Sequence, residues 1–101
     1  MKNNRFYTVL CTNDNSKGFQ QKVKKEFNGI LHTISDYDKN PHQIENFLSR
    51  NEIDLIVVDN RKIGHKLAKM IKTSPKINQE KVHFGNGIGV STLIAIIKNK
   101  A

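Results

Sequence analysis

Four short apolar runs alternate along the chain with amphipathic segments of helical period, and this alternation constrains the fold more than any other feature of the sequence. The runs begin near residues 5, 30, 53 and 81, so successive starts are separated by about one strand, one helix and their connections. No two consecutive runs are joined by the two-residue turn of a hairpin. The pattern therefore predicts an α/β fold, a three-layer sandwich with a parallel sheet of about four strands between helices.

Three segments give the clearest local signals. In Ile53–Asp59, five of seven residues are apolar and most are β-branched or leucine, which predicts a central strand. Asn40 followed by Pro41 predicts the start of the second helix, because asparagine caps helices and proline favours their first position. The last helix, over about residues 90–98, is apolar nearly all round, so we expect it to pack on more than one side.

Length and composition limit the class of protein. The 101 residues fit a single domain over 1–101, and 17 Lys and Arg against 9 Asp and Glu leave a charge of +8 that attracts anions. No apolar run reaches the roughly 18 residues of a membrane span. Cys11 is the one cysteine and is expected to be a small core residue. We therefore expect a cytoplasmic protein with no membrane contact.

Acidic residues follow two of the predicted strands, Asp14 after the first and Asp59 at the end of the third. A family resemblance is carried by these aspartates and by the stretches GILHTISDYDKNPHQIENFLSRNEIDLIVVD and KLAKMIKTSPKINQEKVHF. Over about residues 5–84 the chain resembles the receiver domain of bacterial two-component response regulators. The resemblance implies a flavodoxin-like fold and a signalling or regulatory protein that binds a partner and is not an enzyme. It also implies that Asp14 and Asp59 hold Mg²⁺ and that Asp59 accepts a phosphoryl group.

The chain departs from the receiver pattern at three places. Asn13 stands where the family has a first acid, and Gly85 and Asn86 stand where it has a small hydroxyl residue. The fifth strand and its lysine are missing. We therefore expect weak Mg²⁺ binding and a weakened phosphoacceptor, since losing a carboxylate removes a full charge. The simpler interpretation is that the two aspartates cap the helices that follow them.

A glycine-rich stretch joins the fourth predicted strand to the last helix. Glycines between a strand and a helix let successive backbone N–H groups face an anion at the helix N-terminus. An alternative function is therefore the binding of a phosphate ligand or nucleotide, against the simpler interpretation of a flexible turn. The residues concerned are Gly85, Asn86, Gly87, Gly89, Ser91 and Thr92.

Lysines recur after Asp59 at helical spacing. Lys62, Lys66 and Lys69 are expected to form one basic stripe of the third helix. A second alternative is therefore non-specific association with nucleic acid through phosphate contacts. The simpler interpretation is a solvated helix face.

The apolar face of the last helix is larger than one sheet surface can cover, and the fourth strand is expected at an edge of the sheet. Leu93, Ile96 and Ile97 are therefore predicted to meet a protein partner or a second copy of the chain.

Overall fold

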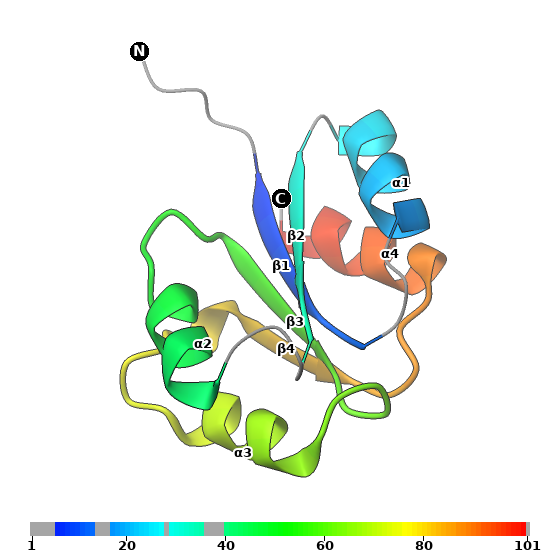
Figure 1. Cartoon of the computed structure of the whole chain (residues 1–101). Coiled ribbons are helices and arrows are strands. Elements are labelled where there is room, and N and C mark those ends of the chain that lie inside the picture. The colour runs from blue at the N-terminus through cyan, green and yellow to red at the C-terminus, as the bar shows by residue number, and fades with distance from the viewer. Residues whose placement is uncertain (1–5, 14–16, 28, 36–39, 101) are drawn as a thin grey trace.

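In the computed structural model, the chain folds into a parallel sheet that lies between two pairs of helices (Figure 1). The structure describes residues 6–13, 17–27, 29–35 and 40–100, without the side chains of residues 17 and 27. In chain order the elements are β1 (Tyr7–Cys11), α1 (Lys17–Phe27), β2 (Ile30–Ile34), α2 (Pro41–Leu48), β3 (Leu55–Asp59), α3 (His65–Thr73), the 3₁₀ turn η1 (Gln79–Lys81), β4 (Val82–Gly85) and α4 (Val90–Lys100).

The strands lie in the order β2, β1, β3, β4, and each neighbouring pair is parallel. This confirms the predicted α/β class with a four-stranded parallel sheet, and the architecture is consistent with a flavodoxin-like three-layer fold. β3 is central, as expected, and all five of its residues are buried. Because the strands are parallel, their carboxyl ends lie at one edge of the sheet, where the loops with candidate residues gather.

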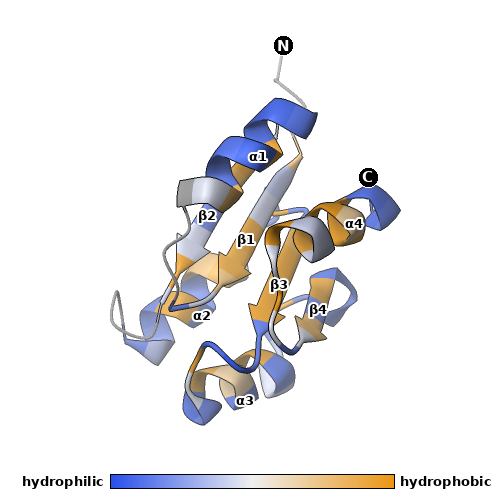
Figure 2. Ribbon diagram, turned by 90° about the vertical axis from the view of Figure 1, so that its right-hand side faces the viewer, coloured by the Kyte–Doolittle hydropathy of each residue, from blue (hydrophilic) through white to orange (hydrophobic). Residues whose placement is uncertain are grey.

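Each face of the sheet has its own core. Val9, Ile56 and Val58 pack under α2 and α3, whereas Leu10 and Val57 pack under α1 and α4 (Figure 1). Successive residues of a strand point to opposite faces, so a strand covered on both sides is apolar at almost every position. Figure 2 shows this for β3, which is almost entirely in the hydrophobic colour between the two helical layers.

The N-terminus of α2 confirms the predicted cap. The Asn40 side chain accepts a hydrogen bond from the Gln43 N–H at 2.9 Å, and the Gln43 side chain accepts one from the Asn40 N–H at 3.3 Å. Pro41 occupies the first turn, where its missing N–H costs nothing. This reciprocal capping starts the helix whose buried face, Ile44 and Leu48, covers β1 and β3.

The predicted interface on α4 is wrong. Leu93 and Ile97 have no exposed surface and Ile96 is 8% exposed, and all three belong to the core under α1 and α4. The helix packs on α1 and on β3 together, so its wide apolar face is covered within the chain, as a helix facing a sheet and a second helix requires. The outer side of α4 is formed by exposed residues such as Ala95 and Lys98.

The structure also bears on two smaller expectations, the burial of Cys11 and the membrane. Cys11 is fully buried in the core under α2 and α3, which confirms it as a core residue. Within the part of the chain that the structure describes, no helix combines the length and the apolar character needed to cross a membrane.

Candidate functional site

Asp59 ends β3 with a side chain that is 2% exposed. Its Oδ1 accepts hydrogen bonds from the backbone N–H groups of Arg61, at 3.1 Å, and Gly87, at 2.9 Å. Its Oδ2 accepts one from the N–H of Ile88 at 2.8 Å. Three donors around one buried carboxylate are strong, charge-assisted partners. Asp59 therefore ties the turn after β3 to the loop after β4.

This geometry gives Asp59 a structural role. A phosphoacceptor needs a carboxylate oxygen that is free to attack phosphorus, and both oxygens of Asp59 are held by N–H groups away from solvent. The interpretation of Asp59 as a helix cap agrees better with these backbone donors, although they lie in two loops and not in the helix that follows Asp59. Phosphoryl acceptance by Asp59 stays a prediction, and the geometry disfavours it.

The predicted Mg²⁺ site is described only in part. Asp14 lies outside the described residues, and Asn13 is exposed and donates its backbone N–H to the Lys62 carbonyl at 2.9 Å. Among the residues that the structure describes, no three His, Cys, Asp or Glu side chains gather to hold a metal ion. Weak Mg²⁺ binding by Asp14 and Asp59 therefore stays an untested prediction, and the backbone donors that occupy both oxygens of Asp59 disfavour it.

The glycine-rich loop does bring N–H groups together, but around an anion of the chain itself. Gly87 has φ of 65°, a left-handed conformation that favours glycine, and it directs two successive N–H groups at Asp59. A ligand phosphate would have to displace that carboxylate from the N–H groups of Gly87 and Ile88. Ser91 and Thr92 are exposed in the first turn of α4, and Asn86 and Gly89 are also exposed. The Ile88 side chain packs closely against Gly85, since a Cβ added at Gly85 would lie 3.0 Å from Ile88 Cδ1.

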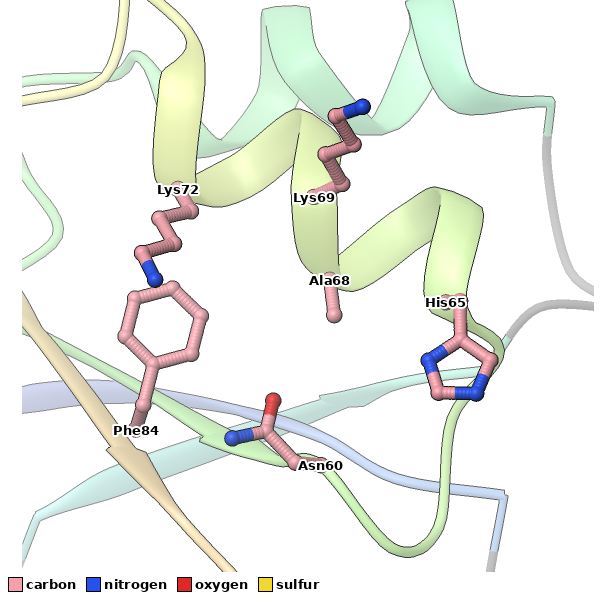
Figure 3. Close-up of a pocket in the computed structure, with 6 residues that line it drawn as sticks. All are labelled: Asn60, His65, Ala68, Lys69, Lys72 and Phe84. Atoms are coloured by element: carbon pink, nitrogen blue, oxygen red, sulfur yellow. The ribbon is translucent and has the colours of Figure 1, made fainter.

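A cleft of about 430 Å³ opens between α3 and the edge strand β4, and we call it the α3–β4 cleft. Its volume falls in the range of small ligand sites. It is lined by Asn60, His65, Ala68, Lys69, Lys72 and Phe84 (Figure 3). Four of these come from one side of α3, Asn60 follows β3, and Phe84 belongs to β4.

The side chains divide the α3–β4 cleft into an apolar wall and a polar rim. Figure 3 shows Lys72 extending toward the ring of Phe84, with Asn60 and His65 facing the same space. Lys69 contributes its stem, and its ammonium group turns away from Asn60 and Phe84 in that view. Carboxylates are not found among the six lining residues. The cleft can therefore hold an anion beside an apolar or aromatic surface.

Two members of the predicted basic stripe, Lys66 and Lys69, are exposed residues of α3. α3 begins at His65, so Lys62 lies in the preceding turn, and of the three predicted lysines only Lys69 lines the cleft. A second set with the same spacing, His65, Lys69 and Lys72, lines the α3–β4 cleft. Sequence reasoning would have found it by placing the helix start after Gly64, the observed N-cap.

Asn60 and Phe84 were missed because the sheet is what brings them to the same cleft. The Asn60 N–H donates to the Gly85 carbonyl at 2.7 Å, which places the end of β3 against the end of β4. Nothing in the local sequence around either residue signals that pairing.

Comparison of the chain with protein-family models, with curated proteins and with solved structures gives no match. The resemblance to receiver domains therefore rests on the residues quoted for it and on the shared architecture.

Proposed function

We propose that this protein is a receiver-like regulatory domain that acts by binding a partner, and that the partner places an anionic group in the α3–β4 cleft. The observation that carries the proposal is the charge of this cleft. Lys72 extends into it toward Phe84, Lys69 lines it with its stem, and the described lining, which also holds a histidine and an amide, includes no acid. Cations without an acidic counterpart in the same cleft attract an anion from another molecule.

The position of the cleft also supports binding. Ligands of parallel α/β sheets bind beyond the carboxyl ends of the strands, and both Asn60 and Phe84 stand at those ends. The net charge of +8 draws anions toward the whole surface, and the cleft supplies directed groups at one place.

The arrangement suits binding better than catalysis. Among the described residues, Asp59 is the buried acid at the carboxyl ends of the strands, and its two oxygens are occupied by backbone donors of two loops. The groups that line the cleft bind and orient an anion through ionic and hydrogen-bonding contacts. We therefore propose recognition without turnover.

Two charge-reversal variants on α3 test the proposal. Lys72→Glu changes the cleft, and Lys66→Glu makes the same change at an exposed position of α3 outside the lining. Hexaglutamate is titrated into the ¹⁵N-labelled protein at low and at high salt. The expected shifts lie at Asn60, along α3 and along β4, and Lys72→Glu should weaken binding roughly tenfold more than Lys66→Glu.

Two other results would point to the alternative functions. Equal weakening by both variants, with a steep salt dependence and tighter binding of single-stranded DNA than of hexaglutamate, would favour non-specific nucleic-acid association. Shifts produced by pyrophosphate and confined to residues 85–92 would favour the glycine-rich loop as the ligand site. Either result would contradict the cleft as the site of function.

A further inference from the structure

The sheet ends at β4 with an edge that no other strand of the described chain covers. An uncovered edge presents backbone N–H and C=O groups that can pair with a further strand. Phe84 of β4 is one of the residues that line the α3–β4 cleft. The α3–β4 cleft and the β4 edge are therefore adjacent features of one surface.

The backbone groups of β4 that face outward follow from its pairing. In parallel strands, alternate residues direct both N–H and C=O to the same neighbour. The Gly85 carbonyl accepts from Asn60 beyond β3, so His83 and Gly85 face the sheet. The N–H and C=O of Phe84 and the C=O of Val82 therefore face the open edge, while the Val82 N–H donates to the Gln79 carbonyl.

The side chains beside this edge determine what an added strand would carry. Phe84 packs against the core under α2 and α3, so its side chain is on the α3 face of the sheet. A residue paired beside Phe84 in a further strand points to the same face, because side-chain direction alternates along strands in step. Such a side chain would enter the α3–β4 cleft beside Lys72.

We propose that the anionic partner is an extended acidic peptide segment that adds to β4 as a further strand, with alternate Glu or Asp side chains in the α3–β4 cleft. This inference rests on the proposed function and names its ligand. Backbone pairing with Phe84 and Val82 supplies affinity, and the contact of the acidic side chains with Lys72 and His65 selects the sequence.

Charge complementarity favours this occupant over two others. A second copy of the chain pairing edge to edge would bring Lys69 and Lys72 of both copies together on proteins of charge +8. A nucleic acid would satisfy the cations but could not offer the alternating donors and acceptors that the edge of β4 requires. An acidic peptide satisfies the cations and the backbone groups together.

Backbone methylation of the peptide separates the two contributions. The parent peptide alternates Glu with Thr over six residues. In one methylated form the Glu nitrogens carry methyl groups, and in the other the Thr nitrogens carry them. Charge and side chains are the same in all three peptides. Only one of the two sets of N–H groups faces β4, and which set does so depends on whether the added strand is parallel or antiparallel.

Binding of each peptide to the full chain is measured by calorimetry and by hydrogen exchange of the Phe84 amide. We expect one methylated peptide to bind like the parent and the other to bind roughly tenfold more weakly. The parent should slow exchange of the Phe84 amide, and Gln in place of Glu should abolish binding. Lys72→Glu should weaken the parent more than Lys66→Glu does.

The outcomes distinguish this inference from the proposed function. If both methylated peptides bind as tightly as the parent and the Phe84 amide is unprotected, strand addition is wrong and an anion-binding cleft remains. If neither the parent nor hexaglutamate shifts the amides of α3 and β4, the proposed function and this inference are both wrong. Dimerisation in the absence of peptide, abolished by a β4 substitution such as Phe84→Lys, would identify a second copy as the occupant and overturn the inference.

Discussion

Replacing Asp59 by Asn tests whether this residue holds the loops or reacts with phosphate. The substitution keeps the shape of the side chain and removes its charge. One oxygen remains and can serve the N–H groups of Arg61 and Gly87, while the new amide group places a donor against the N–H of Ile88. The variant thus loses one hydrogen bond outright and converts two charge-assisted bonds into neutral ones.

The magnitude follows from these contacts. A hydrogen bond to a charged group contributes about 1.5–3 kcal/mol to stability and a neutral one about 1 kcal/mol. Losing one charged bond and weakening two should lower the free energy of unfolding by about 2.5–7 kcal/mol. That is a large part of the roughly 5–15 kcal/mol typical of a whole domain. Urea unfolding followed by circular dichroism measures the difference directly.

Asp54→Asn is the matched control. Asp54 is exposed, and its Oδ2 accepts one backbone hydrogen bond, from the Tyr7 N–H at 2.8 Å. Its replacement should cost less than about 1 kcal/mol. In native-state hydrogen exchange, the amides of Gly87 and Ile88 should lose protection in Asp59→Asn and keep it in Asp54→Asn. Asp59→Asn within about 0.5 kcal/mol of the unmodified protein would refute the structural role and revive the phosphoacceptor.

Three further predictions follow from the same contacts. Millimolar Mg²⁺ should leave the amides of Asn60, Gly87 and Ile88 unshifted, and shifts that Asp59→Asn abolishes would instead support the receiver chemistry. Ile96→Glu should unfold the domain by burying an unpaired charge, whereas Ala95→Glu, one position earlier on the exposed side of α4, should stay folded with an unchanged mass by light scattering. Burial, and then the charge of Glu52, raises the pKa of the Tyr7 phenol above 10.0, against a smaller opposing effect of Arg50. The folded state therefore holds this proton more tightly, so the stabilisation is complete below pH 10.0 and is lost as pH rises through the raised pKa. Phenolate absorbance of a Tyr37→Phe variant, in which Tyr7 is the remaining tyrosine, should titrate above that value, and a midpoint at or below it would contradict the assignment.

The fold could be predicted because its signals are local. The apolar run ending at Asp59 and the capping pair of Asn40 and Pro41 each act within a few residues, so neither depends on tertiary structure. The interface predicted on α4 was wrong for the opposite reason. The apolar face of α4 around Ile97 is covered because α1 and β3 both lie against this helix. Local periodicity does not reveal that second contact.

The candidate site was predicted less well than the fold because its contacts are distant in sequence. Asp59 reaches N–H groups 28 and 29 residues further along the chain, and the glycine-rich loop that donates them was predicted separately as a site for an external anion. Both features were recognised, but the hydrogen bonds between the Asp59 carboxylate and the loop N–H groups depend on the register of β3 and β4. Lys62 was assigned to the third helix, although it lies before it, because the observed N-cap Gly64 makes no side-chain hydrogen bond that would mark the helix start.

The loop contacts and the cleft belong to one arrangement of charge. Asp59 immediately precedes Asn60, so a free carboxylate at this strand end would stand close to the cations of the α3–β4 cleft and weaken their attraction for an outside anion. Instead, the carboxylate is turned to the N–H groups of the two loops and is buried. Within the described residues, Lys69 and Lys72 have no ion pair. The chain thus satisfies its buried acid with backbone donors and leaves the cleft positively charged, which supports the proposal of an anionic ligand.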